Sequence, residues 1–375
     1  MIALAAALLL FIGTQADPTP GNPGGIFSVR LDSDTGQFTS PTLAASTLRP
    51  GFLALHPGGR ILYATTDTRG FQGPSTQAPS VFGIEAETGL LQARPSQLDG
   101  GSPLTCASVN AEGNALFATS YREGGIFSFP IDKEGNPGPS VTAITNTAVA
   151  GIDHGTTHPH CAILSPDSRH LYVCDLGRDR IYCYLTASSP PTLTPASTPF
   201  IATAEGTGPR HGVISSDGDF LYVIGERDSS ISVFKRDQAS GALTQLQKVP
   251  TLPDGFNGSN ATAEIRIHPN ERYVYGSNRG HDSISVFARN PSTGLLTPVE
   301  TVPCGGKHPR NFALSPDGAW LVCANRDSDN LVAFHVDAIT GRLSQVGEPA
   351  SVPKPTYVLF ASGSMARMTD DGRKK

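Results

Sequence analysis

Histidine, arginine and acidic side chains recur at two kinds of position in this sequence, just before and just after short apolar runs. The residues before a run are His158, His160, Arg210, His211, His308 and Arg310. Those after a run are Asp175, Glu226, Asn278, Arg279, Asn325 and Arg326. A guanidinium presents a planar fork of donors that suits a carboxylate or a phosphate. A histidine beside a carboxylate can move protons near neutral pH. These residue types together indicate acid–base chemistry on a small anionic substrate.

Each of these residues also has a purely structural interpretation. Asp and Asn after a strand often cap turns, and an Arg at that point often pairs with a neighbouring segment. His158 and His160 are spaced so that they could bind a metal, but the sequence offers no third ligand at a useful spacing. It also contains no G-x-S-x-G, no H-E-x-x-H and no P-loop. We therefore expect no metal and no other cofactor.

The elements that position these side chains repeat along the chain. The fullest copy spans residues 264–287, E-I-R-I-H-P-N-E-R-Y-V-Y-G-S-N-R-G-H-D-S-I-S-V-F, and its pattern predicts three short strands joined by polar turns. The second residue of the first turn recurs at positions 57, 111, 166, 216, 269 and 316, in steps of 47 to 55 residues. A period near fifty without helical stretches predicts an all-β, seven-bladed β-propeller of four-stranded blades. An irregular β-sandwich would not need six copies of one turn.

The propeller geometry predicts where the polar residues meet. The first two strands of a blade are antiparallel, so the start of the first lies beside the end of the second. Loops that enter first strands and loops that leave second strands therefore share one face, around the central channel. Function concentrates on such loops. The turns on the opposite face are ordinary sequences such as S-P-D-G, so we expect the binding site on the first face.

The two ends of the chain are expected to share one blade. Residues 8–14 and 24–31 match the second and third strands of the repeat, and residues 355–361 supply a first strand. Pairing them closes the ring and leaves no exposed sheet edge. It gives a single domain over residues 1–362 with a frayed tail at 363–375. This interpretation favours a cytoplasmic protein. The alternative is secretion, because residues 1–16 resemble the apolar part of a signal peptide, although without a positively charged start.

The net charge limits the classes of binding partner, and the cysteine spacing limits the disulfides. The formal net charge is −5 and basic residues are scattered, so we expect neither a nucleic acid nor an anionic membrane surface as a partner. The sequence gives no indication of the oligomeric state. None of the six cysteines forms a C-x-x-C pair, and most fall inside predicted strands. We expect buried thiols, with Cys161–Cys174 as the pair to test for a disulfide.

Several of these stretches resemble the seven-bladed lactonase family, which contains the propeller-type 6-phosphogluconolactonases and the fungal 3-carboxy-cis,cis-muconate cyclases. The resembling motifs are H-P-H-C-A-I-L-S-P-D (158–167), G-P-R-H (208–211), L-Y-V-I-G-E (221–226), S-N-R-G-H-D-S-I (277–284) and P-R-N-F-A-L-S-P-D-G (309–318). The resemblance covers almost the whole chain. Residues 110–121 match weakly, and Thr65-Thr66-Asp67 lacks the N-R dipeptide, so the first two blades are poor guides to substrate contacts.

The resemblance implies the following site. The family's histidine, first arginine and glutamate correspond to His160, Arg210 and Glu226, and its second arginine to Arg279, with Arg266 as a less certain partner. It also implies catalysis without a metal. We predict these four as catalytic residues, and as substrate-binding residues Arg266, His158, His211, Asn278 and Arg310.

The predicted activity is hydrolysis of a sugar lactone such as 6-phosphogluconolactone. Arginines would hold the anionic group, and His160 or Glu226 would serve as acid and base. One alternative is a muconate cyclase acting on a dicarboxylate, because it needs the same arginines and a proton donor. A second alternative is a non-enzymatic propeller that binds a protein or a sugar.

Overall fold

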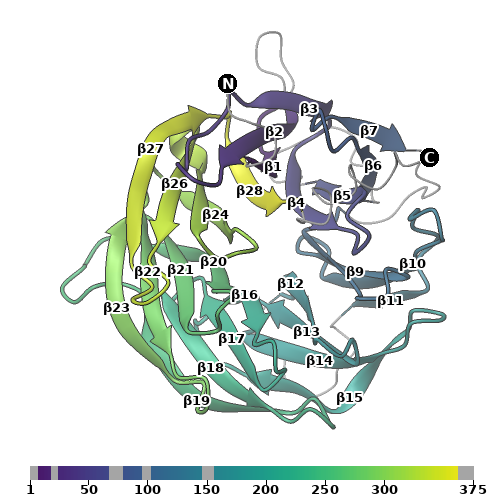
Figure 1. Ribbon diagram of the computed structural model, residues 1–375. Helices are drawn as coiled ribbons and strands as arrows, with labels where there is room; N and C mark the ends of the chain where they lie inside the picture. Colours follow the sequence, from purple (N-terminus) through teal and green to yellow (C-terminus); the bar gives the residue numbers. More distant parts are fainter. Residues whose placement is uncertain (1–6, 18–23, 67–78, 95–102, 146–155, 362–375) are drawn as a thin grey trace, which may run out of the picture.

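The chain folds into a ring of seven four-stranded sheets (Figure 1), described by a computed structural model for residues 7–17, 24–66, 79–94, 103–145 and 156–361. Within each sheet all neighbouring strands are antiparallel. The first strand of each blade lies at the central channel and the fourth at the outside. The predicted all-β, seven-bladed propeller is thus confirmed.

We number the blades from the one that contains the first and the last strand, β1 and β28. Blade 1 contains β28 (Pro355–Phe360), β1 (Ala7–Thr14), β2 (Gly25–Asp32) and β3 (Thr42–Ser46). Blade 2 contains β4 (Pro50–Leu55), β5 (Ile61–Thr66), β6 (Ser80–Ile84) and β7 (Leu91–Arg94). Blade 3 contains β8 (Cys106–Val109), β9 (Ala115–Ser120), β10 (Gly125–Pro130) and β11 (Thr142–Thr145). Blade 4 contains β12 (Pro159–Leu164), β13 (His170–Asp175), β14 (Arg180–Thr186) and β15 (Leu193–Ala202).

The remaining three blades follow the same order. Blade 5 contains β16 (Pro209–Ile214), β17 (Phe220–Gly225), β18 (Ser230–Arg236) and β19 (Leu243–Pro250). Blade 6 contains β20 (Ala261–Ile267), β21 (Tyr273–Arg279), β22 (Ser283–Arg289) and β23 (Leu296–Pro303). Blade 7 contains β24 (Pro309–Leu314), β25 (Trp320–Asn325), the 3₁₀ turn η3 (Arg326–Ser328), β26 (Asn330–Val336) and β27 (Leu343–Ser351).

Blade 1 closes the ring as predicted. Strand β1 pairs on one side with β28, with Ile12 opposite Val358, and on the other side with β2. Residues 7–14 are therefore a strand in the middle of a sheet. Residues 1–6 and the predicted tail at 363–375 lie outside the described residues. In the part of the chain that is described, no helix is long and apolar enough to cross a membrane.

The blades pack face to face and bury both sides of their inner strands. Every residue of β13 and of β17 is buried. Between blades 7 and 1, Leu10 and Val29 share a buried cluster with Trp320 and Leu331. Burial on both faces explains why the second strands are apolar runs instead of alternating patterns, and it supplies the main driving force for closing the ring.

A tyrosine in the second strand ties several blades to the next one. In four blades its hydroxyl donates to the carbonyl of a glycine in the turn between the third and fourth strands of the following blade. The pairs are Tyr63 to Gly135, Tyr172 to Gly241, Tyr222 to Gly294 and Tyr275 to Gly341, at 2.8 to 2.9 Å. Each glycine has a φ between 73° and 83°, a region that favours glycine over other residues. The recurring turn glycine is thus needed both for its backbone conformation and for this contact.

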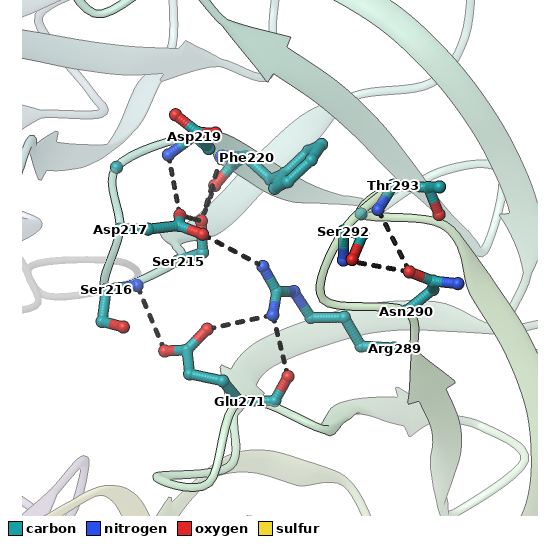
Figure 2. A network of polar contacts seen from close by, with 12 residues as sticks. Ser215, Ser216, Asp217, Asp219, Phe220, Glu271, Arg289, Asn290, Ser292 and Thr293 are labelled. Carbon is teal, nitrogen blue, oxygen red and sulfur yellow. Dashed lines mark hydrogen bonds and ion pairs between the residues drawn. The ribbon is translucent and has the colours of Figure 1, made fainter.

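Arg289 joins blades 5 and 6 on the face that carries the hairpins between first and second strands (Figure 2). Its guanidinium donates to the carbonyl of Glu271 (2.8 Å) and pairs with the Glu271 carboxylate (3.3 Å). It also reaches the carboxylate of Asp217 (4.0 Å) and the hydroxyl of Tyr222 (2.7 Å). Glu271 in turn accepts from the backbone N–H of Ser216 (3.1 Å). Because one buried cation satisfies groups in both blades, its loss leaves several of them unpaired.

We expect Arg289→Ala to lower the free energy of unfolding by about 3 kcal/mol, because breaking a buried charge network leaves uncompensated polar groups behind. Urea denaturation would measure the loss. The matched control is Arg342→Ala: the Arg342 side chain is 56% exposed, compared with 1% for Arg289, and pairs with Glu300 at the surface. An exposed pair contributes below about 1 kcal/mol. Equal losses in the two variants would show that Arg289 does not clamp the blades.

Candidate active site

Five first strands begin at the mouth of the channel with the same irregularity. In blades 2, 4, 5 and 7 the pairing register shifts between a proline and the residue two positions later. Blade 1 shifts in the same way after Pro355. The residues skipped by the ladder are Gly51, His160, Arg210, Arg310 and Thr356. A bulge leaves its extra residue outside the ladder and re-aims the side chain, and all five of these residues line one pocket.

This pocket encloses about 610 Å³, including the part that is open to solvent. Its cationic and imidazole lining residues are Arg122, Arg210, Arg310, His160 and His211. Its aromatic lining residues are Phe52, Tyr121 and Tyr357. A concave site with apolar walls and a few convergent polar groups is typical of small-molecule pockets.

Arg210 is held from behind by Glu226. Its Nε donates to Oε2 of Glu226 (2.8 Å), and its Nη1 donates to the carbonyl of Ala263 (2.6 Å). Arg279 pairs with the same carboxylate oxygen at 2.8 Å and donates to the carbonyl of Thr262 at 2.6 Å. Arg210 and Arg279 are therefore fixed as a pair by one shared carboxylate. The geometry brings together three of the four predicted catalytic residues.

The two arginines determine the ionisation of Glu226. Burial would raise the pKa of the Glu226 carboxyl, but the charges of Arg210 and Arg279 outweigh it and lower the pKa to about 2. Glu226 is ionised at any pH at which the protein would work. A carboxylate with such a low pKa is a weak proton acceptor near neutral pH.

The lowered pKa predicts a loss of stability in acid. The unfolded-state pKa of a glutamate is about 4.3, so the contribution of Glu226 is fully present above roughly pH 5 and is lost as the pH falls towards 2. We expect Glu226→Gln to be less stable than wild type by about 2 kcal/mol at pH 7, and the difference to shrink at pH 3. Urea denaturation at both pH values tests this. Glu348→Gln, at an exposed site, is the control and should track wild type.

A second carboxylate, Glu264, lies beside the pocket and is buried. Its Oε2 accepts from Nδ1 of His211 (3.1 Å) and from the amide of Asn311. Its Oε1 lies 3.6 Å from Nε of Arg266. Nη2 of Arg266 donates to the hydroxyl of Tyr357 (3.2 Å). Burial raises the pKa of Glu264, but Arg266 and His211 lower it to about 2. Arg266 thus contacts Glu264 and Tyr357 and is not among the residues that line the pocket.

His160 lies among aromatic rings. Its ring centroid is 5.0 Å from that of His211 and 5.6 Å from that of Tyr121. His158 stacks on the ring of Tyr121, with the ring centroids 4.5 Å apart, and bonds to the Tyr121 carbonyl through Nδ1 (2.8 Å). His158 therefore supports Tyr121, whereas His160 itself lines the pocket.

The predicted site residues fall into three groups. His160, Arg210, His211 and Arg310 line the pocket. Glu226, Arg266 and His158 contact lining residues, and Arg279 contacts Glu226. Asn278 belongs to neither group, because its buried amide bonds to Thr251 and Ser283.

Asp175 shows the same structural use as Asn278, since its carboxylate accepts from the backbone N–H groups of His158 (2.8 Å) and Gly177 (3.1 Å). Asp175 and Asn278 therefore have structural roles: their side chains bond to neighbouring loops and do not line the pocket.

Sequence reasoning missed much of the pocket wall. Tyr121, Arg122, Phe52 and Tyr357 line it, yet none stood out by residue type. Their positions in the repeat could have identified two of them as pocket residues. Phe52 and Tyr357 occupy the place in their blades that His211 and Asn311 occupy in theirs, two residues after a proline that opens the first strand.

The cysteines are structural. All six are buried and free of disulfides, and Cys161 lies opposite Cys174 on paired strands without a bond between them. Among the described residues, no three His, Cys, Asp or Glu side chains lie together as metal ligands would.

The chain is thus a seven-bladed ring with a basic and imidazole-lined pocket at the mouth of its channel. Comparison with known proteins identifies its class. The family described as "Lactonase, 7-bladed beta-propeller" matches residues 9–360. The chain belongs to this lactonase family. The resemblance seen in the sequence motifs is thereby confirmed.

Individual relatives carry related names. The chain is 30% identical over 358 residues to a 6-phosphogluconolactonase of Bacillus subtilis, covering 93% of this chain and 98% of that protein. It is 29% identical to a 6-phosphogluconolactonase of Formosa agariphila, covering 90% and 95%. Among solved structures it is similar to a periplasmic gluconolactonase of Pseudomonas aeruginosa, with a TM-score of 0.86, 29% identity and coverage of 95% and 99%.

Proposed function

We propose that this lactonase hydrolyses the lactone of a sugar acid, with a phosphorylated sugar acid such as 6-phosphogluconate as the product. The observation that carries the proposal is that the bulged residues of the first strands of blades 4, 5 and 7, His160, Arg210 and Arg310, line a single pocket. The names of the relatives support the same substrate class.

The charge around the pocket supports an anionic substrate. Arg210 and Arg279 share the single carboxylate of Glu226, so this group of three carries one net positive charge. Arg310 and Arg122 add two further positive charges at the pocket wall. The whole chain has a net charge of −5, so this concentration of positive charge is local. A phosphate or carboxylate group on the substrate is attracted to it.

In the proposed mechanism Arg210 and Arg310 contact the substrate. Their N–H groups stabilise the negative charge that develops on the carbonyl oxygen as water adds to it, or hold the anionic group in place. Arg279 does not line the pocket and acts as a positioning residue, because it fixes the carboxylate that holds Arg210.

His160 is the proposed acid–base residue. Its imidazole takes a proton from water as the water oxygen bonds to the lactone carbonyl carbon. The tetrahedral intermediate then collapses, the bond between that carbon and the ring oxygen breaks, and the imidazolium returns the proton to the ring oxygen. Glu226 suits this role less well than His160, because its pKa is lowered to about 2 and both arginines occupy it.

A panel of substrates tests the proposal. Purified protein would be assayed by pH-stat for acid release from 6-phosphogluconolactone and from unphosphorylated gluconolactone, and by ultraviolet absorbance for loss of the diene of 3-carboxy-cis,cis-muconate. We expect the highest kcat/KM for the phosphorylated lactone. Preferential loss of the diene would favour a cyclase instead. No turnover of any compound would favour a binding platform.

We also infer that residues 7–14 remain on the mature protein and are not removed as part of a signal peptide. Cleavage after residue 16 would remove β1, the strand that joins β28 to β2 in blade 1. The intact mass of protein purified from its natural host checks this. A mass lacking residues 1–16 would contradict it.

A further inference from the structure

His211 is held differently from His160, although both line the pocket. The Nδ1 atom of His211 bonds to Oε2 of Glu264 at 3.1 Å, and both side chains are buried. Glu264 is not among the residues that line the pocket. The His211 ring therefore spans from a buried carboxylate on one side to the pocket on the other.

The partners of Glu264 determine which ring nitrogen carries the proton. The backbone N–H of Val358 donates to Oδ1 of Asn311 (2.9 Å), so the other end of this amide is its NH₂ group, which faces Glu264 as a donor. The backbone N–H of Ile265 donates to Oε1 of Glu264 (3.1 Å). Glu264 is therefore surrounded by donors and acts only as an acceptor. The bond to His211 requires a proton on Nδ1.

A neutral imidazole with its proton on Nδ1 has an unprotonated Nε2, which is an acceptor only. Burial lowers the pKa of His211 to about 4, more than Glu264 raises it, so the ring is neutral near pH 7. No group in the described part of the chain bonds to Nε2; the other contacts of the ring are those to Phe52 and His160. Nε2 is thus a fixed acceptor that receives no hydrogen bond from the described residues.

We propose that Nε2 of His211 accepts a hydrogen bond from one ring hydroxyl of the sugar lactone, and that Glu264 is the positioning residue that keeps this acceptor fixed. The inference rests on the proposed function. It identifies a ring hydroxyl as the substrate group that this part of the pocket recognises. A hydroxyl supplies the hydrogen that Nε2 needs, whereas an ionised carboxylate has none. The pocket thus combines arginines for the anionic group with one acceptor for a hydroxyl.

The test compares substrates that lack one hydroxyl, in wild type and in a His211 variant. In His211→Asn the amide nitrogen lies where Nδ1 was and can still donate to Glu264, while the acceptor Nε2 is gone. The substrates are 6-phosphogluconolactone and its 2-deoxy, 3-deoxy and 4-deoxy analogues. With wild type, we expect one analogue to lose about 10- to 100-fold in kcat/KM, as is usual when a buried polar group loses its partner. With His211→Asn, that loss should fall below about 3-fold.

Glu264→Gln provides a second variant. A glutamine can donate to Nδ1 and shift the proton to Nε2, so it should reduce discrimination against the same analogue and leave the other two ratios unchanged. His335→Asn, at an exposed site, is the control and should keep all wild-type ratios. If each analogue loses the same factor in His211→Asn as in wild type, His211 does not read a hydroxyl. If wild type hydrolyses none of these lactones, the proposed function fails and this reading of its substrate fails with it.

A further measurement does not depend on whether a His211 variant folds. Long-range ¹H–¹⁵N spectra of the wild-type protein report which imidazole nitrogens are protonated. A histidine with Nδ1 protonated and Nε2 unprotonated from pH 6 to 8, altered in Glu264→Gln, is the expected result. Its absence would overturn the fixed-acceptor arrangement even if the protein is a lactonase.

Discussion

Arg210→Gln is expected to lower kcat/KM for lactone hydrolysis by about 10²–10³, the usual effect of removing one preorganised donor to a developing oxyanion. Arg210 is only 2% exposed and lies between the Glu226 carboxylate, the carbonyl of Ala263 and the pocket. A glutamine is too short to make these contacts and has no charge. Steady-state kinetics with the phosphorylated lactone measures the loss.

Variants of two other arginines provide comparisons for that result. Arg342→Gln, at the surface, should change kcat/KM by less than about 2-fold. Arg279→Gln should give an intermediate loss, because Arg279 acts on Arg210 through Glu226. An Arg210→Gln enzyme with nearly wild-type kcat/KM and an intact fold would remove this arginine from the proposed mechanism.

The second large effect is expected for His160→Ala, a loss of about 10³ in kcat, within the range for a general acid–base residue. His160 is the bulged residue of β12 and lines the pocket between Tyr121 and His211. Its removal leaves no proposed group to accept the proton of the attacking water.

Chemical rescue separates this role from a structural one. Added imidazole should restore part of the kcat of His160→Ala, because the small ring can enter the space left by the side chain and accept the proton. His335→Ala, at an exposed site, should keep wild-type activity. Lack of rescue together with a loss confined to KM would indicate that His160 binds substrate without transferring protons.

The fold was predictable because the turn sequences show the repeat directly. Six copies of one hairpin turn fix the number and order of the strands between them, and the strand-like segments at 8–14 and 355–361 lack partners elsewhere. The ring then has one way to close, which the pairing of β1 with β28 confirms. Local turn chemistry and burial agree within the blades, so the strands of a blade could be predicted from the local sequence.

The site was less predictable, because it depends on a one-residue register shift. The bulge after the opening proline directs His160, Arg210 and Arg310 to the mouth of the channel, and a spacing argument cannot separate these positions from Glu226 or Asn278. Asn278 was predicted to follow a second strand, but it lies within β21, and its amide bonds to Thr251. Residue type signals that a group can bind an anion; only the local backbone decides where it points.

The central claim is that the pocket at the mouth of the ring opens lactones through His160 and Arg210. The most direct test is the rate of acid release from 6-phosphogluconolactone, measured by pH-stat with wild type and with the double variant His160→Ala/Arg210→Ala. We predict clear acceleration by wild type over the spontaneous rate and a return to near that rate in the folded double variant. Wild-type activity in the double variant, or no acceleration by wild type, would contradict the claim.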